Sequence, residues 1–128
     1  LIEKETSIKE EKNLVAEVIL KRLKKGIPLG IDAAIIYGIK NFDGNLRKFD
    51  LRNKSNIYNT RINKNLPPTA ICSPSLSSLL AVVSPSKQEY LYYVKIPGND
   101  KKRHHFSKTL SEHRTHVKKL VKYHKDNK

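Results

Sequence analysis

Apolar residues recur every three or four positions along residues 8–25, which predicts an amphipathic helix. Ser7 and Glu10 stand three residues apart at its start, the spacing of a capping box. Gly26 is expected to end it, because glycine adopts the left-handed conformation that closes many helices. Residues 108–125 predict a second long helix, with apolar residues on one side and lysines on the other.

Shorter elements are predicted between these two helices. Residues 29–39 are mostly apolar and predict a short helix or strand, and residues 40–68 are polar and predict a long loop. Residues 75–83 predict a helix with its large apolar side chains on one stripe. The members of that stripe are Leu76, Leu79, Leu80 and Val83.

Residues 90–96 are rich in tyrosine and branched side chains and predict a strand. Residues 97–100 have the composition of a turn, and residues 103–107 can return as the paired strand. Several helices separated from a small antiparallel hairpin predict an α+β fold. The length of 128 residues fits a single domain.

Basic residues dominate the charge, with 26 Lys and Arg against 12 Asp and Glu, a formal net charge of +14. Such a chain attracts polyanions, which include nucleic acid, anionic lipid and acidic cell-wall polymer. The lysines are scattered rather than clustered in one stripe, so charge alone does not choose among these partners.

Redox, metal and membrane functions find little support in the sequence. Cys72 is the only cysteine, which excludes an intramolecular disulfide and a thiolate cluster. The five histidines form no zinc motif, so neither a metal nor another cofactor is expected. The longest apolar run, Leu79–Val83, is far too short to span a bilayer.

The segment IEKET near the start contains two carboxylates, Glu3 and Glu5. It is predicted to be the last turn of a helix that meets the helix of residues 8–25, so that Glu5 lies at the junction against apolar surface from Val15 and Ile19. A carboxyl group in such a place tends to stay protonated. Glu3 lies about 200° away around the helix and is interpreted as a solvated residue. Without further information, Glu5 would also be interpreted as a solvated carboxylate.

A series of motifs in order reverses that interpretation. EKET, VILKRLKKGIPL, IDAAIIYG, YNT, LPPTAICSP, YLYYV and HHFSKTLSEH together resemble the MltG/YceG-like endolytic murein transglycosylases, over nearly the whole chain. The resemblance implies a lytic transglycosylase that cuts peptidoglycan between N-acetylmuramic acid and N-acetylglucosamine. Such an enzyme uses no water and leaves a 1,6-anhydro-muramyl end. The resemblance also implies that Glu5 is the catalytic acid, with Thr6 beside it.

Further substrate-binding residues follow from the matching motifs. Tyr58, Asn59 and Thr60 lie in the long polar loop, where amide and hydroxyl groups can bond sugars; a simple polar turn is the alternative. Asp32 and Tyr37 belong to IDAAIIYG.

His105, in HHFS, is expected to contact substrate or orient the catalytic acid, and packing at the sheet edge is the alternative. Three departures from the family pattern indicate a modified cleft wall: Gly30 in place of glutamine, and Ile31 and Ala33 where the family's threonine and proline are missing.

The resemblance also sets the expected context. Residues 1–128 are interpreted as the C-terminal part of the catalytic domain, with a membrane anchor and a LysM-like subdomain outside this chain. The domain is then expected in the cell envelope, anchored to the cytoplasmic membrane with its catalytic part on the periplasmic or extracellular side. It would limit the length of nascent glycan strands during cell division and wall biogenesis, with peptidoglycan synthases or divisome proteins as possible partners.

A basic module that binds RNA or another nucleic acid is the alternative function. The net charge favours it, as do Tyr90, Tyr92 and Tyr93, because aromatic side chains on a sheet can stack on bases. Alternation along the strand, however, places Tyr90 and Tyr92 on one face with Val94, where they are expected to belong to the core. No known nucleic-acid-binding motif is present.

Overall fold

The computed structural model describes residues 1–98 and 102–127, and these residues form six helices and one two-stranded antiparallel sheet. The arrangement confirms the α+β class. In chain order the elements are α1 (Ile2–Glu5), α2 (Lys9–Lys25), α3 (Asp32–Tyr37), α4 (Lys48–Arg52), α5 (Leu76–Val83), β1 (Tyr92–Lys95), β2 (His104–Ser107) and α6 (Leu110–Asp126).

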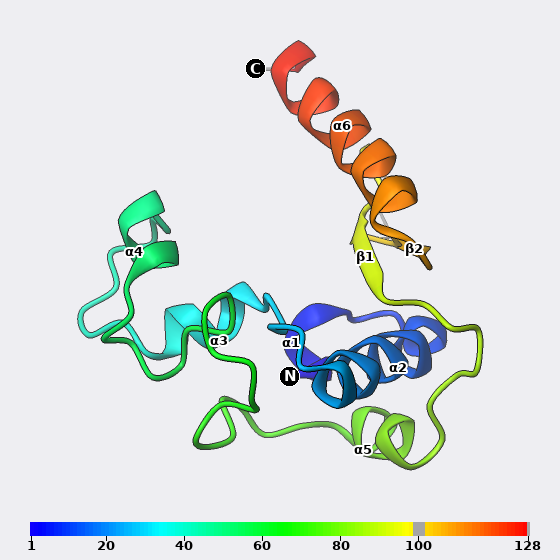
Figure 1. Cartoon of the computed structure of the whole chain (residues 1–128), viewed down its shortest axis with the longest axis horizontal. Coiled ribbons are helices and arrows are strands. Elements are labelled where there is room, and N and C mark those ends of the chain that lie inside the picture. Colours follow the sequence, from blue (N-terminus) through cyan, green and yellow to red (C-terminus); the bar gives the residue numbers. More distant parts are fainter. Residues whose placement is uncertain (99–101, 128) are drawn as a thin grey trace.

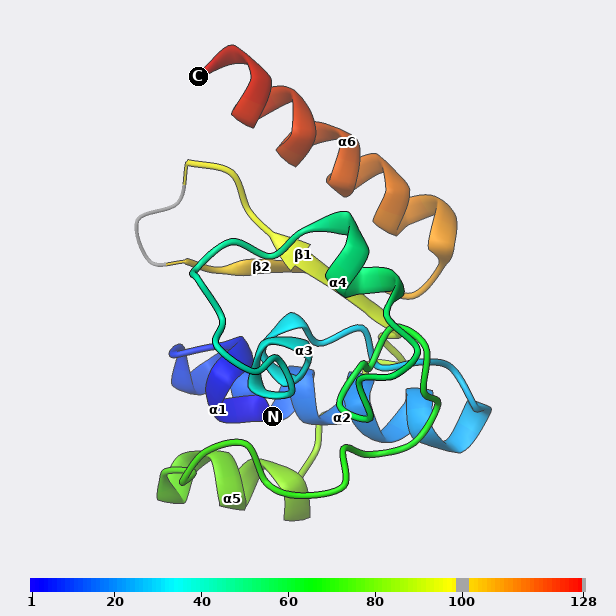
Figure 2. The ribbon, with the colours of Figure 1, turned by 90° about the vertical axis from the view of Figure 1, so that its left-hand side faces the viewer.

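Helix α2 lies between α1 and α5 and organises the core (Figures 1 and 2). Its buried side chains pack with residues from α1, from α5 and from the segment that leads into α3. The members of this core are Ile2, Val15, Ala16, Ile19, Leu29, Ile31, Ala34 and Ala81. Gly26 ends α2 in the left-handed conformation, with a φ of 69°, as expected. Residues 29–39 contain the short helix α3, which resolves the choice between helix and strand.

The start of α2 differs from the expected capping box. Neither Ser7 nor Glu10 caps the helix; the Thr6 hydroxyl accepts a hydrogen bond from the Ile8 amide at 3.1 Å and donates one to Glu11 Oε1 at 3.0 Å. Both Thr6 and Glu11 are buried. Ile8 stands at the N-cap without a side-chain cap. The hydroxyl that bonds this junction belongs to Thr6, and the carboxylate it bonds lies inside the protein.

Helix α5 carries the expected apolar stripe, and the stripe lies on the exposed side of the helix. Leu76 and Val83 are 71% and 75% exposed, whereas Ser78 and Ala81 are buried. Hydrogen bonds explain this orientation of α5. The Glu3 carboxylate accepts from the Ser75 backbone amide and hydroxyl, at 3.0 and 2.7 Å, and from the Ser78 hydroxyl. These bonds turn the serine face of α5 toward α1.

Glu3 therefore has a structural role that its interpretation as a solvated residue missed. The hydrogen bonds from Ser78 and Ser75 lower the pKa of Glu3 from 4.5 to about 2. A carboxylate with a depressed pKa contributes stability above its usual pKa, and this contribution is lost as the pH falls through the lowered value.

We expect Glu3→Gln to remove part of the acid dependence of stability between pH 4.5 and about pH 2. Urea unfolding followed across that range measures the effect. Glu10→Gln, an exposed residue on α2, is the matched control and should leave the acid dependence unchanged. Equal acid dependence in Glu3→Gln and the unmodified protein would contradict the role given to Glu3.

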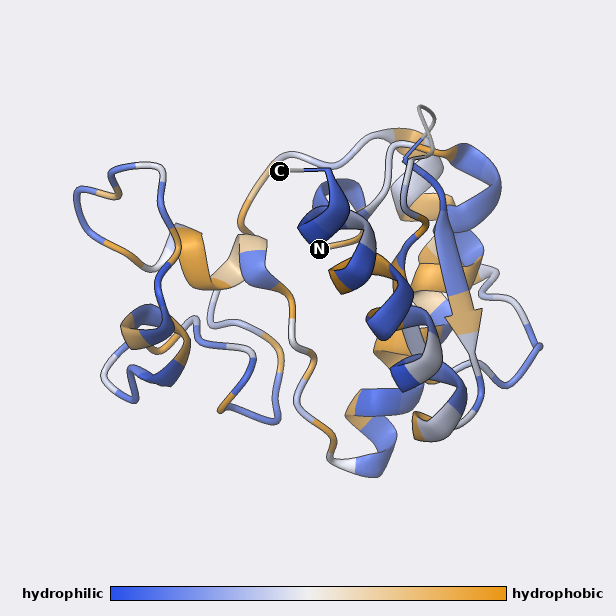
Figure 3. Ribbon diagram, turned by 90° about the horizontal axis from the view of Figure 1, so that it is seen from above, coloured by the Kyte–Doolittle hydropathy of each residue, from blue (hydrophilic) through white to orange (hydrophobic). Residues whose placement is uncertain are grey.

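The hairpin and α6 form a second layer above α2 (Figures 1 and 2). Strands β1 and β2 pair with Tyr93 opposite Phe106 and Lys95 opposite His104, which confirms the predicted hairpin. Part of its predicted turn, residues 99–100, lies outside the described residues. Tyr93 and Phe106 pack against the core, and the opposite face of the hairpin contacts α6, most of which is hydrophilic (Figure 3).

The face of β1 that packs against the core is therefore not the expected one, which carries Tyr92. Tyr93 faces the core, whereas Tyr92 stacks on His113 of α6 with ring centroids 5.1 Å apart and lies under the Arg22 guanidinium. None of the described helices is long and apolar enough to span a membrane.

Candidate active site

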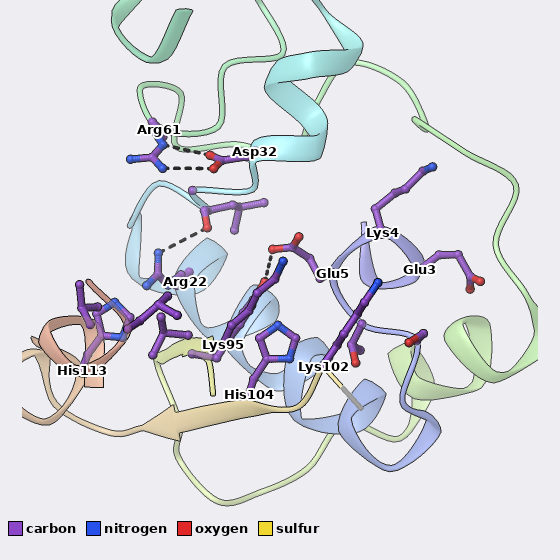
Figure 4. A pocket seen from close by; sticks show the side chains of 18 residues that line it. Glu3, Lys4, Glu5, Arg22, Asp32, Arg61, Lys95, Lys102, His104 and His113 are labelled. Atoms are coloured by element: carbon purple, nitrogen blue, oxygen red, sulfur yellow. Dashed lines mark hydrogen bonds and ion pairs between the residues drawn. The ribbon is translucent and has the colours of Figure 1, made fainter. Parts of the chain in front are cut away.

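A cleft of about 760 Å³ opens between α1, the hairpin, α6 and the segment before α3 (Figure 4). Its floor and walls combine carboxylates, basic side chains and a few apolar residues. The lining residues are Glu3, Lys4, Glu5, Thr6, Ser7, Arg22, Leu29, Gly30, Asp32, Arg61, Tyr93, Val94, Lys95, Lys102, His104, His113, Val117 and Leu120.

Glu5 ends α1 and projects into this cleft, half-buried. The Tyr93 hydroxyl donates a hydrogen bond to Glu5 Oε1. Glu5 was expected to lie against Val15 and Ile19, but Ile2 packs in the core cluster with them. Helix α1 turns Ile2 toward the core and Glu5 toward the hairpin. The junction of α1 and α2 therefore holds Glu5 as predicted, but an aromatic strand residue is its neighbour.

A buried network supports the cleft beneath Glu5. The Glu11 carboxylate accepts hydrogen bonds from the His104 backbone amide at 2.7 Å and from Thr6 at 3.0 Å, and its Oε1 lies 2.8 Å from His104 Nδ1. The side chains of Glu11 and His104 are each only 5% exposed. This network fixes the end of α1 and the start of β2 to the first turns of α2.

Burial raises the pKa of Glu5, and the charge of Asp32 adds to this effect. The hydrogen bond from Tyr93 and the nearby His104 oppose it without reversing it. Burial and the neighbouring Glu5 also raise the pKa of Tyr93 well above its usual value, so its hydroxyl stays a donor. A half-buried carboxyl group with a raised pKa can act as a general acid, since part of it carries a proton when ordinary glutamates do not.

Two of the expected substrate-binding residues share the cleft with Glu5. Thr6 lines it while accepting a hydrogen bond from the Ile8 amide just before α2, and Asp32 lines its opposite wall. Asp32 forms a two-point ion pair with Arg61, at 3.1 and 3.3 Å. Gly30, on the same wall, has a φ of +65° and donates its amide to the Thr60 carbonyl at 2.9 Å. Its missing side chain leaves that wall open toward Arg22.

The loop residues of the YNT motif are placed elsewhere. Asn59 and Thr60 are 0% and 1% exposed, and neither lines the cleft. The Thr60 hydroxyl bonds both the amide and the carbonyl of Ile31, each at 2.8 Å. Tyr58 packs its ring against Tyr37, with centroids 4.9 Å apart, also outside the cleft. The geometry therefore favours a structural role for this motif, in which it fastens the loop to the segment that forms the cleft wall.

His105 points to the other face of the hairpin, where it stacks on His116 of α6 with ring centroids 4.1 Å apart. It does not line the cleft; its neighbour His104 does. Among the described residues, no cluster of three or more histidine, cysteine or carboxylate side chains is arranged to hold a metal.

Sequence reasoning missed three residues of this site, namely Tyr93, His104 and Glu11. The sequence held a signal for two of them. Residues paired across a hairpin lie on the same face, as do residues two apart on one strand. If Phe106 is taken to face the core, Tyr93 and His104 follow on that face, which is the side of Glu5. The only signal for Glu11 was its position one turn into α2, which does not distinguish a buried carboxylate from an exposed one.

Comparison with known proteins assigns the chain to a family. The sequence model of the YceG-like family matches residues 1–119. The chain is 33% identical over 121 residues, 94% of its length, to a Bacillus subtilis protein named endolytic murein transglycosylase. It is 33% identical over 98 residues, 73% of its length, to a Streptococcus pneumoniae protein of the same name. This chain therefore belongs to the YceG-like family, as its motifs predicted.

A solved structure has the same fold. The crystal structure of a YceG-like protein from Listeria monocytogenes matches 89% of this chain with a TM-score of 0.78 at 32% sequence identity. The chain spans about a third of that structure, 36%, and 32% and 18% of the Bacillus and Streptococcus proteins.

Proposed function

We propose that this chain supplies the catalytic centre of an endolytic murein transglycosylase, with Glu5 as its acid. The observation that carries the proposal is Glu5 itself: a half-buried carboxyl group with a raised pKa in a cleft large enough for sugar residues. Family membership, and the name that the related Bacillus and Streptococcus proteins bear, support the substrate class.

One carboxyl group can suffice for this reaction. Glu5 gives its proton to the glycosidic oxygen as the bond to muramic acid C1 breaks, and the C6 hydroxyl of the same sugar attacks C1. Glu5 then accepts the C6 hydroxyl proton, so it ends as it began. Attack within one molecule benefits from a high effective concentration, which replaces the second carboxylate of ordinary glycosidases. Asp32, the other carboxylate near Glu5, is held by Arg61, which favours a structural role for it.

The products test this chemistry. Digestion of purified peptidoglycan should release fragments with 1,6-anhydro ends, about 18 Da lighter than hydrolysed ends because no water is added. The fragments should come from cuts within long strands. Mass analysis distinguishes the two kinds of end, and reducing muramic ends would show that a carboxylate, with Asp32 the first suspect, activates water. Release of disaccharides alone would contradict internal cutting.

Tyr93 is proposed to orient Glu5 and to moderate its pKa. Tyr93→Phe removes a hydrogen bond that lowers the pKa of Glu5, so this pKa should rise further. The alkaline limb of the pH–rate profile should therefore move to higher pH, with a loss of about tenfold in rate from poorer orientation. Tyr90→Phe, which removes a hydroxyl from a strand neighbour, is the control. An unchanged profile in Tyr93→Phe would contradict the role proposed for the hydroxyl.

The cellular setting is proposed from the family alone. A murein substrate would place this domain outside the cytoplasmic membrane, held there by a part of the protein other than the described residues. A role in limiting strand length during division, together with synthase or divisome partners, belongs to the same proposal. Fractionation of cells, with the chain detected in the envelope, tests the location.

The nucleic-acid alternative loses its main structural support. Its stacking surface would be the aromatic face of the hairpin, but Tyr93 and Phe106 pack against the core and Tyr92 stacks on α6. The aromatic side chains on both faces of the hairpin therefore already pack against other described parts of the chain.

A further inference from the structure

The cleft around Glu5 contains more basic side chains than its acidic residues neutralise. Five basic and three acidic side chains line it. Two of the acidic residues are already bonded: Glu3 by Ser75, Ser78 and Lys12, and Asp32 by Arg61.

The basic residues divide into two groups. Arg61 pairs with Asp32, and Arg22 donates to the backbone carbonyls of Leu91 and Pro28 at 2.8 and 3.0 Å. The other three, Lys4, Lys95 and Lys102, are exposed, and none of the salt bridges within residues 1–98 and 102–127 involves them. Lys95 and Lys102 extend toward the open space of the cleft, whereas Lys4 extends away from them (Figure 4).

Strand geometry places Lys95 close to the acid. Tyr93 and Lys95 are two residues apart on β1, so they lie on the same face, about 7 Å apart along the strand. Tyr93 donates to Glu5, and Lys95 pairs with His104 across the hairpin. Figure 4 shows Lys95 and Lys102 extending from the hairpin toward the helix that carries Glu5.

From this arrangement we propose that Lys95 and Lys102 form a subsite for the carboxylates of peptide substituents carried by the strand that Glu5 cleaves. The proposal rests on the proposed function and names the form of the substrate. A strand without peptides carries only the lactyl carboxylate of each muramic acid, which is held close to the sugar ring. Peptide stems carry carboxylates on flexible chains, and lysine, a point charge on a flexible stem, suits a ligand of variable position.

Binding to a non-cleaving form of the protein is the direct test. Glu5→Gln is mixed with two probes: glycan strands with their peptide stems, and the same strands after an amidase has removed the stems. We expect tighter binding of the peptide-bearing strands, with an advantage that falls as salt is added. In a Glu5→Gln protein that also carries Lys95→Gln and Lys102→Gln, the advantage should fall roughly tenfold, as for the loss of charge-assisted contacts. Binding of bare strands, which keep only the lactyl carboxylates close to the sugar ring, should fall much less.

Matched variants keep the test specific. Lys118→Gln with Lys122→Gln removes the same charge from exposed positions of α6 that do not line the cleft, and should leave the advantage intact. Lys95→Arg with Lys102→Arg keeps the charge and should restore most of it. An equal loss in the α6 variant would overturn the subsite in favour of a general charge effect. Equal loss for bare and peptide-bearing strands would overturn it in favour of binding to the sugars or their lactyl carboxylates, or of misfolding.

The remaining outcomes separate this proposal from the proposed function. Equal cleavage of both kinds of strand by the unmodified protein, with no effect of the lysine variants, would overturn the subsite but not the proposed transglycosylase activity. Failure to cleave either strand overturns the function itself. A phosphate-bearing wall polymer that binds more tightly than peptide-bearing strands, with the same lysine dependence, would overturn the assignment to carboxylates.

Discussion

Glu5→Gln is expected to abolish strand cleavage while the protein stays folded. The amide keeps the size and shape of the side chain, and its oxygen can still accept the hydrogen bond from Tyr93. It has no proton to give to the glycosidic oxygen, so the rate should fall by roughly 10²–10⁴-fold, the usual contribution of a general acid. Turnover of purified peptidoglycan and thermal unfolding, measured on one preparation, check both halves of the expectation.

The matched control for this prediction is Glu10→Gln. Glu10 is exposed on α2 and does not line the cleft, so the same chemical change there should leave turnover unaltered. Retention of most activity in Glu5→Gln would remove Glu5 from the mechanism and direct attention to Asp32, on the opposite wall. A lower unfolding temperature that accounts for the lost activity would make the carboxyl group structural.

Local patterns predicted the elements well because each has a strong local cause. The 3.6-residue period of α2, the left-handed Gly26 and the β-forming residues of the hairpin act over a few neighbours, and all three appear in the structure. The position of Glu5 at a helix junction also followed from local sequence. These features need no knowledge of distant parts of the chain.

The rest depended on contacts far apart in the sequence. The apolar stripe of α5 resembles a core face, but the bond between Glu3 and Ser78, 75 residues apart, turns it outward. The choice between His104 and His105 depends on which face of the hairpin meets the core, and a shift of one residue reverses it. The hydroxyl of Thr6, rather than that of Ser7, makes the hydrogen bonds at the start of α2, because the buried Glu11 accepts from it.

The loop motif gives the sharpest case of a local pattern with two interpretations, because Asn59 fits either a sugar contact or a structural bond. In the structure its amide donates to the carbonyls of Asp50, Leu51 and Asn53 at 3.4, 3.2 and 3.0 Å. Its Oδ1 accepts from the Arg61 amide at 3.1 Å. One side chain thus joins the end of α4 to the residue that pairs with Asp32.

Asn59→Ala should therefore destabilise the protein, by roughly 2–4 kcal/mol, because it removes a fully buried side chain and its hydrogen bonds to partly buried backbone groups. Denaturant unfolding measures this loss. Asn63→Ala, which removes an exposed amide from the same loop, is the matched control and should cost little. Activity assayed well below the unfolding temperature should be largely retained, since Asn59 is 0% exposed. Unchanged stability with lost turnover would return Asn59 to the substrate site.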